Sequence, residues 1–195
     1  MLVFMGTYKE MKSAFQNEYK ERSAIYKNRL SEWSQDPPIK RLEGPTNIPR
    51  ARELGYKAKE GIDIVRVRVH GGSRKRKEHG GGRKPSKSGR YFTRAKSLQS
   101  IAEERVSKAY PNYEVLNSYF VGKAGSTEYY EVIMLNKQSK VLMSSPYYSA
   151  IMSQNGRAQR GLTRSGRKHR GIARKAYGTI SMRPSKRSKI RSNPK

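Results

Sequence analysis

The residues of this chain that could do chemistry are overwhelmingly cationic. The sequence holds 43 Lys and Arg against 15 Asp and Glu, and its formal net charge is +28. The histidines, His70, His79 and His169, lie in basic, glycine-rich surroundings, whereas a metal ligand or catalytic base usually needs a carboxylate that orients it. The absence of cysteine excludes disulfides, thiolate catalysis and Cys-based zinc sites. The sequence therefore predicts no catalytic residue, no metal site, no cofactor and no enzymatic activity.

A charge of this size limits the partners to polyanions, which are nucleic acids, anionic membranes and acidic proteins. A membrane is disfavoured because the longest apolar runs, such as residues 132–135, are far shorter than the roughly 20 residues of a span. The apolar start is too short for a signal peptide, and Met5 is an alternative start. We therefore expect a nucleic-acid partner, no membrane and no small-molecule substrate.

The first of two strongly basic segments is the run 71–89. It contains six glycines, seven Lys or Arg, one acid (Glu78) and no hydrophobic residue. It is long for a loop inside a compact domain, and its glycines allow the backbone to approach phosphates closely. Its GGGRK stretch lacks the G-x-x-x-x-G-K-[ST] spacing of a nucleotide phosphate loop. We therefore predict a basic loop over 71–90 that threads between RNA phosphates.

The second basic segment is the carboxyl-terminal third. Residues 132–195 contain no Asp or Glu but sixteen Lys and Arg, fourteen of them from Arg157 onward. Such a segment repels itself and buries little apolar surface, so it needs a dense negative partner to become ordered. Duplex nucleic acid carries one charge per about 1.7 Å of its axis. We predict that residues 140–195 form an extended RNA-threading tail, with a short packed turn near Pro146.

Hydrophobic periodicity predicts the elements that carry these segments. One long amphipathic helix is expected from a capping box at Thr7 and Glu10 to the Pro37-Pro38 pair, with a solvated polar face or, alternatively, one that contacts RNA. Residues 37–60 are expected to be irregular. Further predictions are a strand over 62–69, a helix over 93–109, and strands over 113–121 and 129–135 joined as an antiparallel hairpin. Glu103 and Glu104 are expected to be exposed helix charges.

Few strands with helices packed on them indicate an α+β fold. We predict a small antiparallel sheet with packed helices, a long basic loop and an extended basic C-terminal arm. The expected division is an N-terminal amphipathic helix over 1–36, an α+β core over 37–139 with the basic loop 71–90, and the tail over 140–195.

The candidate RNA-binding residues are cations of the basic segments, of the strand face that Arg66, Arg68 and His70 share, and of the stretches 52–59 and 94–96, together with one tyrosine. Tyrosines beside cations could stack on unpaired bases, each worth about 1–3 kcal/mol. The predicted RNA-binding residues are Arg52, Tyr56, Lys57, Lys59, Arg66, Arg68, Arg74, Lys75, Arg76, Lys77, Arg83, Lys84, Lys87, Arg90, Arg94, Lys96, Arg157, Arg160, Arg164, Arg167, Lys168, Arg170, Arg174 and Lys175.

Separated blocks of the sequence, in order, resemble a known family. They are ARELGYKAKEG (51–61) with the strand 65–69, GG and RKR (71–76), AKSLQSIAEER with VLNSY (95–119), and RGLTRSGRKHRG (160–171). Together they are similar to the archaeal and eukaryotic large-subunit ribosomal proteins called fifteen-e, which are distinct from the bacterial protein numbered fifteen. The likeness runs over about residues 5–172. His70 stands where the family often has a basic residue, and no firm match is visible beyond Ile172.

The resemblance implies a structural constituent of the large subunit that binds ribosomal RNA (rRNA), lies in the cytoplasmic ribosome beside other ribosomal proteins, and catalyses nothing. The lysine-rich composition favours an archaeal source. The alternative is a general nucleic-acid-compacting, chromatin-like protein, which would bind duplex DNA and RNA equally. An RNA-modifying enzyme would need a cofactor pocket and an acid–base set, and the sequence predicts neither.

Overall fold

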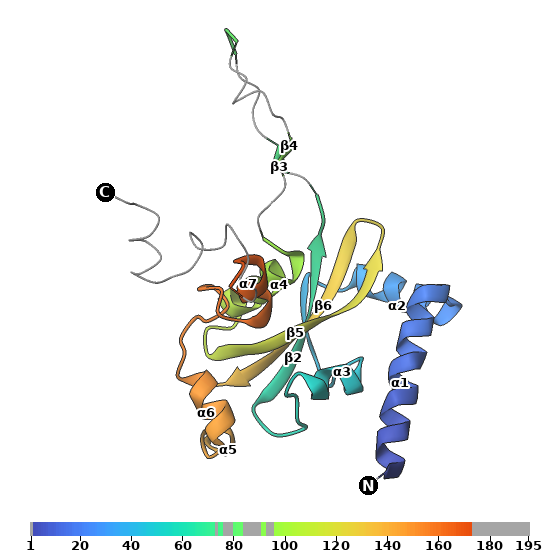
Figure 1. Cartoon of the computed structure of the whole chain (residues 1–195), viewed down its shortest axis with the longest axis vertical. Coiled ribbons are helices and arrows are strands. Elements are labelled where there is room, and N and C mark those ends of the chain that lie inside the picture. Colours follow the sequence, from blue (N-terminus) through green and yellow to red (C-terminus); the bar gives the residue numbers. More distant parts are fainter. Residues whose placement is uncertain (1, 73, 76–79, 84–90, 93–95, 173–195) are drawn as a thin grey trace.

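The computed structural model of the protein describes residues 2–72, 74–75, 80–83, 91–92 and 96–172 (Figure 1). Its helices are α1 (Leu2–Glu21), α2 (Ala24–Gln35), α3 (Ile48–Glu53), α4 (Leu98–Ala109), α5 (Lys140–Met143), α6 (Pro146–Met152) and α7 (Arg164–His169). Its strands are β1 (Ile39–Leu42), β2 (Ile62–His70), β3 (Arg74–Lys75), β4 (Tyr91–Phe92), β5 (Tyr113–Ala124) and β6 (Thr127–Asn136). Four strands form an antiparallel sheet in the order β1-β2-β6-β5, which confirms the predicted α+β class. Within the described ranges, no helix is long and apolar enough to cross a membrane.

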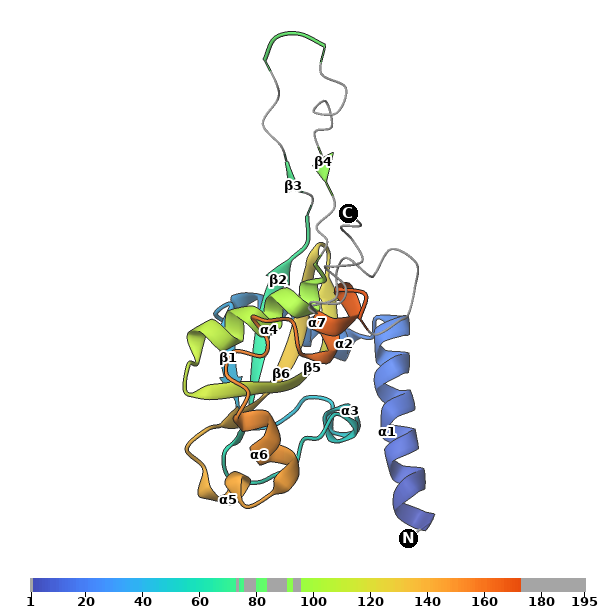
Figure 2. The same ribbon diagram turned by 60° about the vertical axis from the view of Figure 1, so that its left-hand side comes forward.

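One face of this sheet packs under α4 (Figure 2). Val65, Val67 and Val69 of β2 point to this face, as the period-two pattern predicts, and they share a core with Ala102 and Val106 of α4. The helix begins later than expected, at Leu98, because the Ser97 side chain caps it by accepting a hydrogen bond from the Ser100 N–H at 3.2 Å.

The opposite face of the sheet is covered as well. At one end of it α3, α5 and α6 bury Ile62 and Ile133, and at the other end α2 places Trp33 against Tyr129. The face of β2 that carries Arg66 therefore looks into a packed layer and not into solvent.

The predicted long N-terminal helix is wrong, because two helices replace it. Arg22 has φ 54, which breaks the helix, and the Ser23 hydroxyl then caps α2 by accepting the Tyr26 N–H at 3.2 Å. The turn lets α2 pack on the sheet, whereas no side chain described between residues 6 and 21 is fully buried. In Figures 1 and 2, α1 lies beside the sheet layers as a separate rod. Thr7 lies inside α1, so the capping box does not mark a helix start.

Two further elements were missed between residues 37 and 60. β1 pairs with β2, and α3 begins where the Asn47 side chain accepts the Arg50 N–H at 3.0 Å, with Pro49 in its first turn. By contrast, the predicted antiparallel hairpin is confirmed. Its strands run further than expected and leave only Gly125 and Ser126 as the turn.

The predicted start of an extended arm near residue 140 is also corrected. Residues 140–172 contain α5, α6 and α7, and they bury Leu142, Tyr148 and Met152 against the sheet. A few apolar side chains suffice for this packing, because they complete a core that already exists. Residues 173–195 lie outside the described residues.

Glu131 of β6 is a fully buried carboxylate that ties the loop before α3 to the sheet. It accepts hydrogen bonds from the Thr46 N–H at 3.1 Å and from the hydroxyls of Thr46 and Tyr119. Burial raises the pKa of the Glu131 carboxyl, against the lowering effect of these donors. Burial, the Glu131 charge and their hydrogen bond likewise raise the pKa of Tyr119, so its phenol stays protonated and donates.

A Glu131→Gln variant is expected to gain stability relative to the native protein as the pH rises. A raised folded pKa stabilises the fold below the unfolded value of about 4.3, and this contribution is lost as the pH climbs through the folded pKa. The variant lacks this titration, so the difference in unfolding free energy should grow by up to about 1.4 kcal/mol per pH unit inside that window. Urea unfolding of both proteins across this range measures it. A difference that stays constant with pH would contradict the raised pKa.

Candidate nucleic-acid interface

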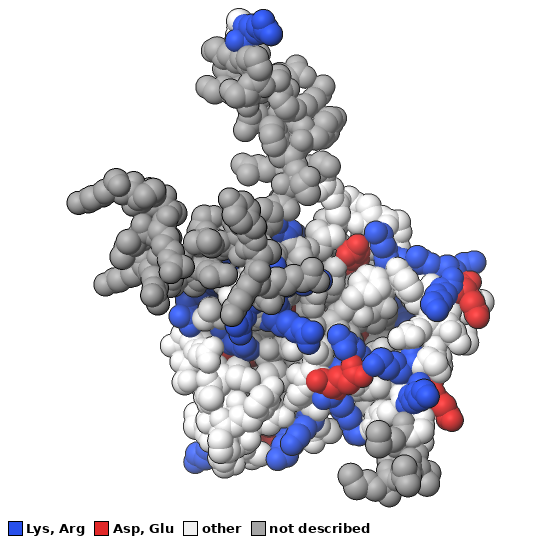
Figure 3. Space-filling model, in the orientation of Figure 1, with Lys and Arg blue, Asp and Glu red and all other residues white. Residues whose placement is uncertain are grey.

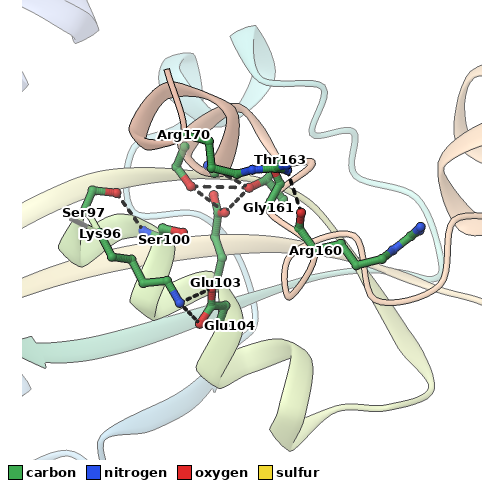
Figure 4. Close-up of polar contacts among 11 residues, drawn as sticks. Lys96, Ser97, Ser100, Glu103, Glu104, Arg160, Gly161, Thr163 and Arg170 are labelled. Atoms are coloured by element: carbon green, nitrogen blue, oxygen red, sulfur yellow. Dashed lines mark hydrogen bonds and ion pairs between the residues drawn. The ribbon is translucent and has the colours of Figure 1, made fainter. Parts of the chain in front are cut away.

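The glycine–arginine block over residues 160–171 is anchored by a buried carboxylate. Glu103 of α4 is fully buried and accepts hydrogen bonds from the hydroxyls of Ser118, Thr163 (2.5 Å) and Ser165 (2.6 Å) (Figure 4). The prediction that Glu103 is an exposed charge is therefore wrong, because α7 and β5 cover it. Its neighbour Glu104 is partly buried, with a side chain 20% exposed, and pairs with Lys96 at 2.6 Å.

A second buried carboxylate fixes the chain just before this block. Glu114 of β5 is 1% exposed and accepts the N–H groups of Gly156 at 2.9 Å and Arg157 at 3.1 Å. The Arg157 guanidinium turns inward and donates to the carbonyls of Val115 at 2.7 Å and Leu116 at 2.9 Å. Burial lowers the pKa of Arg157, against the raising effect of Glu114. Two acids from the core thus hold a segment that has none of its own.

The glycines of the block allow α7 to fold back closely on the preceding turn. A Cβ on Gly166 would lie 2.7 Å from the Gly161 Cα, which no side chain tolerates. Gly161 itself has φ 65, and Arg170 donates from its guanidinium to the carbonyls of Arg160 at 2.8 Å and Gly161 at 3.3 Å. The block is therefore a compact unit packed on α4.

Folding of the block leaves its remaining cations on the surface. Arg160, Arg164, Arg167 and Lys168 are exposed, and none of them forms an ion pair with a described acid. In Figure 3 blue side chains gather over the place of α7, whereas beside α1 and α3 blue and red are mixed. We call these four residues the α7 cation cluster.

Many other cations are engaged by acids. Ion pairs link the described acids to Lys12, Arg29, Lys40, Arg41, Arg50, Arg66, Lys96, Lys123 and Lys137. Two predicted RNA contacts, Arg66 and Lys96, fall in this group. Arg66 is 9% exposed, lies 2.6 Å from Asp36 and stacks over Trp33 at 4.4 Å, so its geometry favours a structural role.

The other predicted site residues are spread over the molecule. Arg68 donates to the Ser34 carbonyl at 2.5 Å, and the Arg52 guanidinium lies 5.4 Å from the Tyr8 ring centre. Tyr56 packs partly buried against the core, and the exposed predicted residues outside the cluster, where burial is described, are Arg52, Lys57, Lys59 and Arg83. Arg74 and Lys75 form β3, which pairs with β4 at the base of the basic loop and projects from the end of β2 (Figure 2). The residues Arg76, Lys77, Lys84, Lys87, Arg90, Arg94, Arg174 and Lys175 lie outside the described residues.

Sequence reasoning missed the anchors of the interface. A signal for Glu103 is present, since Ser100 and Ser107 lie three residues before and four after it and are also buried. Small polar residues at these spacings indicate a polar contact face next to the apolar stripe.

Comparison with known proteins matches the part of the chain that contains these blocks. Residues 6–189 match the model of the family described as "Ribosomal L15". The chain belongs to this family. The match extends past Ile172, further along the chain than the likeness visible in the sequence blocks.

Two archaeal relatives share most of their length with this chain. "Large ribosomal subunit protein eL15" of Nanoarchaeum equitans (strain Kin4-M) is 41% identical over 189 residues, which cover 96% of this chain and 100% of the relative. A protein of the same name from Methanocorpusculum labreanum (strain ATCC 43576 / DSM 4855 / Z) is 44% identical over 158 residues, 80% of this chain and 81% of the relative. The chain is thus a large-subunit ribosomal protein, a structural component of the cytoplasmic ribosome.

Proposed function

We propose that this protein binds and stabilises folded rRNA in the large subunit, and that the α7 cation cluster is its folded contact surface. The observation that carries the proposal is the contrast in charge pairing. The four cluster residues are exposed and have no described acid partner, on a segment held rigid by Glu103 and Glu114.

This arrangement suits phosphate recognition. Arg presents a planar fork for bidentate contact to phosphate, and Lys presents a mobile point charge. Because the segment is already ordered, RNA binding does not bear the entropy cost of folding it. Recognition would follow the shape and backbone of the RNA, and the loop 71–90 and the residues after 172 would add further phosphate contacts.

The wider assembly follows from the same proposal. The partners would be large-subunit rRNA and neighbouring ribosomal proteins, and the protein would act as a structural constituent and not as an enzyme. The second candidate is a chromatin-like compacting protein, which only the total charge favours. Such a protein would bind duplex DNA and RNA equally.

The test is the salt dependence of binding to large-subunit rRNA, with duplex DNA as competitor. If eight cations meet phosphates, the slope of log affinity against log salt should be about −6 to −7, and more contacts would make it steeper. The protein should also stay with large subunits in a high-salt wash. A slope of about −2 would contradict extensive phosphate contact. Equal competition by duplex DNA would favour the compacting protein instead.

A further inference from the structure

A groove lies beside the α7 cation cluster, over the edge strand β5. It is lined by Tyr147 and Ile151 of α6, by Leu116 and Asn117 of β5, by Leu162, and by the arginines Arg157, Arg164 and Arg167. Its volume is about 340 Å³, at the small end of the range of ligand pockets. The groove therefore joins aromatic and aliphatic side chains to three arginines, of which Arg164 and Arg167 are exposed.

Part of this groove is built on an irregularity of β5. The register with β6 shifts between Val115 and Asn117, so Leu116 has no partner across the strand pair. At this bulge the Arg157 guanidinium donates to the carbonyls of Val115 and Leu116. Bulges commonly re-aim side chains next to functional sites, and this one brings Leu116 and Asn117 to the same groove.

Asn117 offers a hydrogen-bonding group there. Its side-chain oxygen accepts the Ser118 N–H at 3.0 Å. Its amide nitrogen has no hydrogen-bond partner among the described residues. A half-buried amide nitrogen in a groove can donate to an acceptor on a ligand.

Tyr147 is held in place yet open to solvent. Its side chain is 57% exposed, and its ring meets that of the buried Tyr148 edge-to-face at 5.1 Å. Tyr148 is fixed in turn by donating to the Gly55 carbonyl at 2.9 Å. A Cβ on Gly55 would lie 3.2 Å from the Tyr147 hydroxyl oxygen, so glycine leaves room for that ring. An exposed, positioned aromatic ring is a stacking platform for a base.

We propose that this groove binds a single unstacked nucleotide of rRNA. The base stacks on Tyr147, the Asn117 amide nitrogen donates to an acceptor on the base edge, and Arg164 with Arg167 hold the adjoining phosphate. This rests on the proposed RNA-binding function and names its ligand more closely. The groove favours a nucleotide over a peptide, because the exposed Arg164 and Arg167 suit a phosphate beside an exposed ring that suits a base.

The test compares Tyr147→Ala and Tyr147→Phe with the native protein. The probes are a single-stranded oligoadenylate and an RNA duplex of equal length. Loss of one stacked base weakens binding by about 5- to 150-fold, so Tyr147→Ala should lose affinity for oligoadenylate by this factor. Duplex affinity and the salt slope should stay unchanged, and Tyr147→Phe should bind as the native protein does.

Two outcomes would overturn the groove proposal without touching the proposed function. One is unchanged oligoadenylate affinity in Tyr147→Ala, with salt-dependent RNA binding intact. The other is displacement of bound oligoadenylate by a peptide of alternating Glu and Leu at lower concentrations than free RNA requires. That result would identify a protein ligand. Failure of the native protein to bind either RNA would instead refute the proposed function. Thermal unfolding of Tyr147→Ala confirms its fold, and ultraviolet crosslinking of oligoadenylate to the native protein, mapped to residues 116–117 or 147, gives a readout independent of the variants.

Discussion

Replacing Glu103 with alanine is expected to lower the free energy of unfolding by about 3–5 kcal/mol. The carboxylate is fully buried and is the acceptor for the hydroxyls of Ser118, Thr163 and Ser165. Its removal leaves three hydroxyl donors facing a cavity in a region that water does not reach. At about 2–4 °C per kcal/mol for a chain of this size, the melting temperature should fall by roughly 6–20 °C. Thermal unfolding followed by circular dichroism measures this loss.

The neighbouring residue provides a matched control. Glu104→Ala removes the same charge from the same helix turn, but among the described residues Glu104 pairs with the partly exposed cation Lys96, and pairs near the surface contribute about 0–1 kcal/mol. Glu103→Gln should fall between the two, since an amide keeps one acceptor and hydroxyls can rotate to accept from its nitrogen. Equal losses in Glu103→Ala and Glu104→Ala would show that α7 is not anchored through Glu103.

The parts of the fold that repeat a simple period were predictable. The valines of β2, the apolar stripe of α4 and the β5–β6 hairpin are set by side-chain alternation, and the structure has all three. The break between α1 and α2 at Arg22 was not predictable, because the apolar stripe continues on both sides of it. Only the capping preference of Ser23 competes with the helix there, and its contribution is about 1 kcal/mol.

The candidate interface was predictable in composition but not in detail. An acid-free segment indicates a polyanion partner, yet it does not tell which cations stay unpaired. Arg66 and Arg167 look equivalent in the sequence, whereas the first lies against Asp36 and the second faces solvent. That distinction depends on contacts between residues far apart in the chain. For the same reason, composition could not reveal that Glu103 and Glu114 would order residues 156–170.

A variant with Arg160, Arg164, Arg167 and Lys168 all replaced by alanine is expected to lose most of its rRNA affinity. Each cation that meets a phosphate contributes about 0.7–0.9 to the magnitude of the log–log salt slope, so the slope should become shallower by about 3. At about 0.1 M salt the same contacts contribute roughly three decades of binding affinity. The dissociation constant of the variant should therefore rise about a thousandfold. Filter binding to large-subunit rRNA over a salt series measures both quantities.

A second quadruple variant separates placement from total charge. Lys12, Lys40, Arg41 and Arg50 are four surface cations that all form ion pairs with acids of the chain. Replacing them with alanine removes the same formal charge of four, but it takes away groups that are already neutralised. Their loss should change the salt slope by less than about 1. Equal loss of affinity in the two variants would mean that the protein is held to RNA by net charge alone, and the α7 cation cluster would then not be a distinct contact surface.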